Sequence, residues 1–206
     1  MIRQRLMSWL SAAAFLLTAA GMAHAQQAPD ALVKQVSTEV LDAAKADKSI
    51  QAGDVRQVMA LVETKVMPHV DFQRMTSSAV GRYWRQASPD QQKRLQDEFK
   101  TLLVRTYSGA LAQVRDQTVQ LKPLRAAATD TEVVVRTEIR GKGDPIQLDY
   151  RLEKLDNGWK IYDVNVLGVW LVENYRNTFA QEISSGGIDG LIAKLVERNK
   201  AAASHS

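Results

Sequence analysis

The apolar residues change their spacing twice along this chain, and the change restricts which folds the chain can adopt. From about residue 30 to residue 114 they recur every three or four positions, which indicates amphipathic helices. Over residues 132–153 apolar and polar residues alternate, which indicates strands with one apolar face. The helical spacing returns after Gly168. Helices, an antiparallel meander and helices again predict an α+β domain.

The expected helices have recognisable ends. We expect helices over residues 30–46 and 55–66, the second closed by Pro68, and a shorter one over residues 71–80. Ser88-Pro89-Asp90-Gln91 combines an N-cap serine, a proline for the first helical position and a glutamine that can complete a capping box. A long helix is therefore predicted from Pro89 onwards. Two further helical segments are expected after Gly168, separated by Gly186-Gly187.

About four strands are expected, over residues 118–124, 132–140, 146–153 and 159–167. A Gly-rich loop at residues 141–145 and the turn Asp156-Asn157-Gly158 join the last three as hairpins. The charged residues of the alternating strands are expected to form a solvated outer face. In the last strand the pattern places Trp159 and Ile161 on one side and Val164 and Val166 on the other. A twisted sheet backed by helices on one face tends to curl and leave room between the layers.

The amino terminus has the layout of a secretory signal peptide. Arg3 and Arg5 precede an apolar stretch over residues 6–23, and Ala23-His24-Ala25 supplies a small-residue cleavage site. An anchoring helix is the alternative, but Ser and Thr residues dilute the apolar run. We expect export with cleavage after Ala25. The predicted domains are a signal peptide (1–25), a single folded domain (26–200) and a disordered tail (201–206).

Composition excludes several classes of site. The chain has no Cys, so disulfides, thiolate metal sites and a thiol nucleophile are excluded. Of its three His residues, only His69 is expected in the folded domain, so we expect no metal. Without Arg3 and Arg5 the mature chain has 25 basic and 23 acidic residues, a weak charge that does not favour nucleic acid. Gly-rich phosphate loops and a Gly-X-Ser-X-Gly motif are also missing.

Three pairs of titratable residues are the best candidates for catalysis: Asp149 with Tyr150, Tyr162 with Asp163, and His69 with Asp71. Neighbours on a strand point to opposite faces, so the first two pairs are not expected to share a site. A His after Pro68 at a helix end more often caps carbonyl groups or lies at the surface. We therefore expect no enzyme, while a small-molecule enzyme and a periplasmic chaperone stay open as alternatives.

The apolar faces of the long helix and of the sheet can either pack directly or surround a cavity, and their periodicity alone favours a filled core. Three blocks of sequence add information: Gly81-Arg82-Tyr83-Trp84-Arg85; Ser88-Pro89-Asp90-Gln91-Gln92 with Phe99, Leu102, Leu103, Thr106 and Tyr107; and Tyr162-Asp163-Val164 through Gly168-Val169 and Asn174-Tyr175-Arg176 to Phe179. In order and spacing these blocks resemble the MlaC family of periplasmic phospholipid-binding proteins, also called toluene-tolerance auxiliary proteins, over nearly the whole mature chain. One departure is Trp170, where the family pattern has a small polar residue, and a bulky indole there could narrow the cavity or its mouth.

The resemblance implies a nuclear-transport-factor-like cone with a hydrophobic cavity that holds acyl chains. It also implies a carrier in the periplasm that shuttles phospholipid between an outer-membrane lipoprotein–porin complex and the substrate-binding subunit of an inner-membrane ABC transporter, and so maintains outer-membrane lipid asymmetry. Phospholipid would then be cargo, and no cofactor is expected. The resemblance favours a cavity over a filled core.

Two sets of residues follow from these expectations. Acyl chains are expected to contact apolar side chains from both layers: Phe99, Leu103, Tyr107, Val133, Val135, Leu148, Tyr150, Val164, Val166, Val172 and Tyr175. Partner proteins are expected to dock on basic residues around the start of the long helix: Arg82, Arg85, Lys93 and Arg94. The alternative for the second set is a solvated helix end.

Overall fold

The computed structural model describes residues 27–203. The predicted signal peptide, its cleavage site and residues 204–206 lie outside the described residues. The helices are α1 (Pro29–Ala46), α2 (Lys48–Gln51), α3 (Val55–Leu61), α4 (Phe72–Val80), α5 (Pro89–Ala112) and α6 (Leu171–Ala203). Three shorter helical segments are η1 (Val62–Val66), η2 (Met67–His69) and η3 (Gly81–Gln86).

The strands form one sheet in the order of the chain, with every neighbouring pair antiparallel. They are β1 (Thr118–Leu121), β2 (Glu132–Arg140), β3 (Ile146–Leu155), β4 (Gly158–Val166) and β5 (Val169–Trp170). The predicted α+β class is confirmed. The sequence pattern did not predict β5, because a strand of two residues is too short to show alternation.

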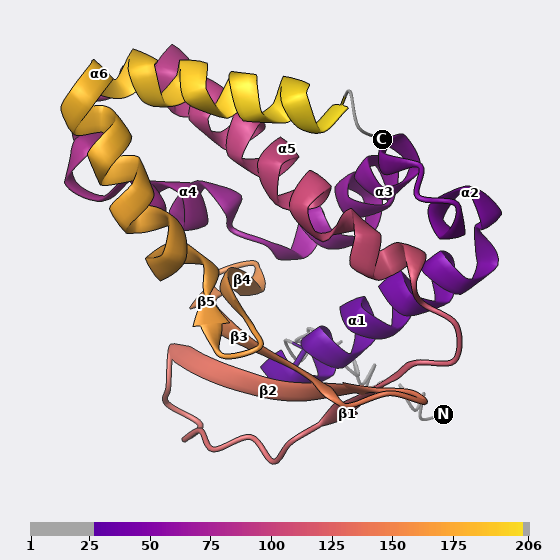
Figure 1. The fold of residues 1–206 in the computed structure, drawn as a ribbon. Coiled ribbons are helices and arrows are strands. Elements are labelled where there is room, and N and C mark those ends of the chain that lie inside the picture. The colour runs from indigo at the N-terminus through magenta and orange to yellow at the C-terminus, as the bar shows by residue number, and fades with distance from the viewer. Residues whose placement is uncertain (1–26, 204–206) are drawn as a thin grey trace, which may run out of the picture.

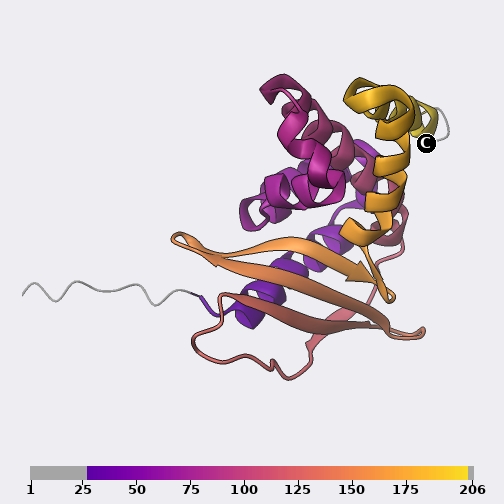
Figure 2. The same ribbon diagram turned by 90° about the vertical axis from the view of Figure 1, so that its left-hand side faces the viewer.

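The helices lie on one side of the sheet. Figures 1 and 2 both place them there, while the segment that joins β1 to β2 passes on the opposite side. We call the side of the sheet toward the helices the inner face and the other side the outer face. The predicted arrangement of a sheet backed by helices along one face is therefore present.

The long helix α5 begins as its sequence predicts. The Ser88 hydroxyl accepts a hydrogen bond from the Gln91 amide at 3.2 Å, and the Gln91 side chain accepts one from the Ser88 amide at 2.9 Å. This capping box satisfies two amide groups that an uncapped helix end would leave without a partner. The helix passes through Gly109 and continues to Ala112.

The carboxyl-terminal helix α6 bends at Gly187, whose φ of 68° and ψ of −172° are not helical. A side chain at such a positive φ would be strained, so glycine suits the bend. The bend is visible in Figure 1. The two helical segments expected on either side of Gly186-Gly187 are thus joined without a loop. The second segment reaches Ala203, three residues into the predicted tail.

The core consists of three apolar clusters. The helix cluster joins buried residues of α4, α5 and α6, among them Met75, Leu95, Phe99, Val172, Tyr175, Phe179 and Leu195. The sheet cluster joins Leu32, Val33 and Val36 of α1 to Val133, Val135, Leu152 and Ile161. A third cluster holds α2, α3 and the end of α5 together through Ile50, Val58, Leu61, Val104 and Val114. Burial of each large apolar side chain stabilises the fold by about 1.5–3 kcal/mol.

A β-bulge changes the facing of residues in β4. Arg151 is paired with Asp163 but Leu152 is paired with Ile161, so Tyr162 is an extra residue on β4. As a result Ile161 belongs to the sheet cluster and Val164 packs on the same inner side. The prediction that Ile161 and Val164 face opposite ways is therefore wrong, because strict alternation takes no account of a bulge.

Candidate functional site

The boundary between the helix cluster and the sheet cluster brings together most residues predicted to contact acyl chains. Phe99, Val172 and Tyr175 are buried in the helix cluster, and Leu103 packs against it. On the opposite side Val133 and Val135 are buried in the sheet cluster, with Tyr150 packed against it. Val164 packs against both clusters. Apolar side chains of the two layers therefore face one another across this boundary.

The remaining predicted residues lie at its margins. Leu148 and Val166 are paired with each other on neighbouring strands and share the inner face with Thr137, but both are only half-buried. Tyr107 of α5 is also half-buried, and burial is the main cause that raises its pKa.

Several residues at the boundary were absent from the predicted set. Leu152 and Ile161 are buried in the sheet cluster, and Val70 packs against both clusters, as Val164 does. Simple alternation assigned Ile161 to the wrong face because the β-bulge adds one residue to β4. Nothing in the sequence shows that Val70, two residues after Pro68, lies between the two layers.

Polar groups on the inner face have local partners. The buried Thr137 hydroxyl donates to the Leu148 carbonyl at 2.8 Å. The Tyr150 hydroxyl lies 3.4 Å from the Ser37 hydroxyl of α1, and burial raises the pKa of Tyr150. A buried hydroxyl with a partner costs little, so these groups leave the face effectively apolar.

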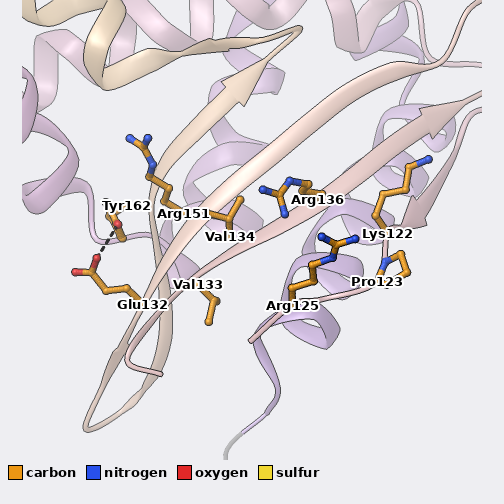
Figure 3. A pocket seen from close by; sticks show the side chains of 9 residues that line it. All are labelled: Lys122, Pro123, Arg125, Glu132, Val133, Val134, Arg136, Arg151 and Tyr162. Atoms are coloured by element: carbon orange, nitrogen blue, oxygen red, sulfur yellow. Dashed lines mark hydrogen bonds between the residues drawn. The ribbon is translucent and has the colours of Figure 1, made fainter. Parts of the chain in front are cut away.

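Two surface hollows adjoin the strands of the sheet. The larger, about 780 Å³, lies on the outer face and is lined mainly by polar residues (Figure 3). The smaller, about 350 Å³, is lined by Met67, Val70, Asp71, Phe72, Gln73, Gln96, Leu155 and Lys160. Of the predicted residues, only Val133 lines either hollow. Most of the predicted side chains instead pack within or against the helix cluster and the sheet cluster.

Arg74 of α4 ties the helices to the sheet beside this boundary. It donates to Glu132 of β2 at 2.6 Å and forms an ion pair with Glu153 of β3. Its guanidinium lies 3.6 Å from the centre of the Tyr162 ring, and the Tyr162 hydroxyl donates to Glu132 at 3.2 Å. The hydrogen bond from Arg74 is the main cause that lowers the pKa of Glu132. One side chain therefore links α4 to three strands.

Asp163 makes a second link, from β4 to the start of α6. Its carboxylate accepts amide hydrogen bonds from Val164 at 2.9 Å and Val172 at 3.1 Å, and it pairs with Arg151 at 3.0 Å. The residue is only 1% exposed, and burial raises its pKa despite these partners. Arg151 in turn lies 3.9 Å above the Trp170 ring. Trp170 thus contacts Arg151, and Arg151 lines the outer hollow.

Comparison with known sequences identifies the family. A profile described as MlaC protein matches residues 34–197 of this chain. The chain belongs to the MlaC family. A relative from Haemophilus influenzae, the intermembrane phospholipid transport system binding protein MlaC, is 25% identical over 93% of this chain and 92% of its own length. Toluene tolerance protein ttg2D from Pseudomonas putida is 26% identical over 86% of each chain.

A solved structure shares a higher sequence identity with this chain. A phospholipid-binding protein from Ralstonia solanacearum, solved in complex with a phospholipid, is 51% identical. It superimposes with a TM-score of 0.82 and covers 84% of this chain and 98% of its own. The predicted family resemblance is confirmed.

The candidate catalytic pairs look different in this MlaC structure from what alternation predicted. Asp149 and Tyr150 are on opposite faces, as expected, although Asp149 is buried where a solvated residue was expected. Tyr162 and Asp163 both lie on the outer face because of the bulge, but they are bound to different partners. His69 is partly buried, and burial and then Lys160 lower its pKa.

Within residues 27–203, no His, Asp and Glu side chains form a group of three or more that could hold a metal ion. The same part of the chain contains no helix with the length and hydropathy needed to cross a membrane.

The basic residues predicted to dock partners lie on η3 and the first turns of α5. Arg82 is exposed and donates to the Tyr83 hydroxyl at 2.9 Å, and Lys93 pairs with Asp97 at 2.5 Å. Arg85 and Arg94 are exposed. All four therefore lie near one end of the helical layer, and their role in docking stays a prediction.

Proposed function

We propose that this protein is an exported periplasmic carrier that binds phospholipid tails and moves them between membrane-bound partners. The observation that supports this most directly is the likeness, at 51% identity, to a protein solved in complex with a phospholipid. The names of the two curated relatives, one for phospholipid transport and one for toluene tolerance, agree with it. On this proposal phospholipid is cargo, and the chain has no cofactor or catalytic residues.

A phospholipid that crosses between two membranes without a carrier would expose its acyl chains to water. Two acyl chains hold roughly thirty methylenes, and exposing them costs about 0.8 kcal/mol each, more than about 20 kcal/mol in total. A carrier removes this barrier by keeping the tails in an apolar environment throughout. Because hydrocarbon and an apolar pocket are similar surroundings, net transfer is close to neutral and the partners can set its direction.

The tails are proposed to lie between the helix cluster and the sheet cluster. A pocket for two chains needs roughly 1,000 Å³, near the top of the usual range and more than either surface hollow offers. We therefore propose that the layers move apart for loading. When the layers separate, each apolar side chain loses its contacts with the opposite layer and gains contacts with an acyl chain. The bound lipid thus offsets the free energy lost when the layers separate. Val70 and Val164, which pack against both clusters, would be separated first.

The smaller hollow is the proposed mouth. Val70 lines it, and Phe72, which also lines it, packs against the helix cluster, so it opens toward the boundary between the layers. Lys160 lines the same hollow, and its ammonium group donates to the Pro68 carbonyl at 2.6 Å. An ammonium group there is suited to a lipid phosphate that stays in water while the tails are buried.

The proposed partners are an outer-membrane lipoprotein–porin complex and the substrate-binding subunit of an inner-membrane ABC transporter. Delivery between them would maintain outer-membrane lipid asymmetry. The exposed basic residues Arg82, Arg85, Lys93 and Arg94 are proposed to contribute to docking, because surface charges steer association between proteins.

Native mass spectrometry of the protein purified from the periplasm tests this proposal. We expect a chain that begins at Gln26, with phospholipid bound and identified by lipid extraction from the same sample. A chain that retains Met1 in a membrane fraction would contradict export. Protein that is empty and takes up no phospholipid from vesicles would contradict the carrier. Turnover of a small molecule would then favour an enzyme, and suppression of client aggregation a chaperone.

A further inference from the structure

The outer face of the sheet is hollowed rather than flat. The hollow of about 780 Å³ is lined by Lys122, Pro123, Arg125, Glu132, Val133, Val134, Arg136, Arg151 and Tyr162. Figure 3 shows Lys122, Pro123 and Arg125 on the segment after β1, and Val134, Arg136 and Arg151 along the strands beside it. The segment that joins β1 to β2 therefore forms one wall, and the sheet forms the floor. Apart from Val133, none of its lining residues belongs to the set proposed to contact lipid tails, which lies on the inner face.

The residues that line the hollow carry more positive than negative charge. Its cationic residues are Lys122, Arg125, Arg136 and Arg151, and its only acidic residue is Glu132. Glu132 is already bound by Arg74 and by the Tyr162 hydroxyl. Any further anion in the hollow would therefore find cationic partners and little repulsion.

Two of the cations are available to a ligand. Lys122 pairs with Glu138, and Arg151 pairs with Asp163. Arg125 and Arg136, by contrast, form no ion pair with any of residues 27–203, and both are exposed. Arg136 is opposite Asp149 in the β2–β3 register, but the Asp149 carboxylate accepts from the Gln147 amide at 2.9 Å instead. Arginine presents a planar fork that suits carboxylates and phosphates.

The form of the hollow discriminates between anionic ligands. A bilayer surface is broad and flat, so it cannot enter a hollow with the β1–β2 segment as one wall. A free phosphate ion would occupy only a small part of the volume and could not contact cations spread from Arg125 to Arg151 (Figure 3). An extended peptide follows such a row and can also place apolar side chains on Val134 and Pro123.

We propose that this outer hollow docks an extended acidic segment of a partner protein, with Arg125 and Arg136 as its main contacts. The inference rests on the proposed function for its biological role, since it adds a docking site to the carrier. The outer hollow and the apolar boundary lie on opposite faces of the sheet. A partner segment bound in the outer hollow therefore leaves the proposed mouth uncovered. The protein can then be held by its partner while lipid enters or leaves.

Fluorescence anisotropy with a labelled peptide of alternating Glu and Ala tests the proposal on the full mature chain. We expect the wild-type protein to bind the peptide at low salt and to lose affinity as salt is added. The double variant Arg125→Glu with Arg136→Glu should bind at least about tenfold more weakly. Lys48→Glu with Arg56→Glu, on α2 and α3, makes the same change in net charge elsewhere and should bind like the wild type. Co-purified phospholipid should be unchanged in both variants, which keeps this test separate from that of the carrier.

Several results would overturn the proposal. One is equal weakening in the two double variants, which would assign the binding to net charge alone. Another is displacement of the peptide by inorganic phosphate more readily than by chloride at matched ionic strength, which would assign the hollow to a small anion. Binding to phosphatidylglycerol vesicles but not to the peptide would assign it to a membrane surface. If the reversed variant does not fold, Arg125→Gln with Arg136→Gln replaces it, and unchanged peptide affinity in that variant also overturns the proposal.

Discussion

The two faces of the sheet bury their residues by different means. On the inner face Val133 and Val135 are 8% and 1% exposed and contact other apolar side chains. On the outer face Asp163 and Asn165 are equally buried, at 1% and 5%, but they are held by hydrogen bonds and an ion pair. A polar strand face therefore need not be a solvated one. Apolar burial on the inner face can be supplied by any apolar group, whereas burial on the outer face depends on specific hydrogen-bond and ion-pair partners.

A charge at the boundary between the layers gives the largest expected effect. In Val164→Asp a carboxylate without a partner would lie between the two apolar clusters, at a cost of a few kcal/mol. We expect the variant to lose most of its bound phospholipid, measured by native mass spectrometry, with circular dichroism to verify folding. Val134→Asp is the matched control on the outer face and should keep its lipid. A folded Val164→Asp protein with a full complement of lipid would contradict the proposed tail site.

Should Val164→Asp fail to fold, Leu148→Asp tests the same face at a half-buried position outside the two clusters. Lipid retained by this variant would place the tails elsewhere.

Removing the guanidinium that links α4 to the strands gives the next effect. Arg74→Leu leaves Glu132 and Glu153 without their main partner, and the Glu153 side chain is only 15% exposed. We expect a loss of about 1–3 kcal/mol in the free energy of unfolding, measured with urea. Arg74→Lys keeps the charge but cannot donate in the same fork, so its loss should be smaller. Equal stability of Arg74→Leu and the wild type would show that the link is not needed.

The outer-face carboxylates should respond to pH with opposite signs. The pKa of Glu132 lies below its ordinary 4.5, so its contribution is present above that pH and is lost as the pH falls through the folded-state value. The pKa of Asp163 lies above its ordinary 3.8, so its ionisation disfavours the fold as the pH rises through the interval between the two values.

We therefore expect Glu132→Gln to lose less stability than the wild type between about pH 5 and about pH 3, measured by chemical denaturation. Asp144→Asn, in the exposed β2–β3 loop, is the control and should follow the wild type. An unchanged acid response in Glu132→Gln would mean that the Arg74 hydrogen bond does not contribute in solution.

The smallest effect on stability is expected at the end of the helical layer. Reversing Arg82 and Arg85 to Glu changes two exposed side chains, so stability should change by less than about 0.5 kcal/mol and the lipid content should stay the same. Association with the partner proteins should weaken at low salt, where surface charge has most effect, measured by surface plasmon resonance. Unchanged association there would reduce these residues to a solvated helix end.

Local signals in the sequence predicted most of the fold. The capping box at Ser88, the proline after it and the period change before β2 each depend on neighbouring residues alone, so each could be interpreted without knowing the fold. The three sequence blocks that resemble the MlaC family predicted which α+β fold the chain adopts. Simple alternation predicted that Val133 and Val135 lie on the inner face.

Non-local contacts explain what the sequence did not predict. That α1 covers the sheet, and that Val70 lies between the two clusters, depends on how distant segments meet. The burial of Asp163 depends on the amide of Val172 and on Arg151, neither of which is next to it in the chain. The hollow on the outer face requires the β1–β2 segment as a wall, and a loop leaves no periodic pattern to predict its course.

The bulge at Tyr162 has a consequence for how relatives of this protein are aligned. Because β4 has one more residue than β3 at this point, the strand has two reading phases, one ending at Ile161 and one beginning at Asp163. A homologue that lacks the extra residue would keep its counterparts of Ile161, Val164 and Val166 on the inner face, because Leu152 and Arg151 would still pair with the same neighbours in plain alternation. A one-residue gap aligned at Tyr162 is therefore compatible with an unchanged sheet, whereas a one-residue gap elsewhere in β4 would turn the residues on one side of it to the opposite face.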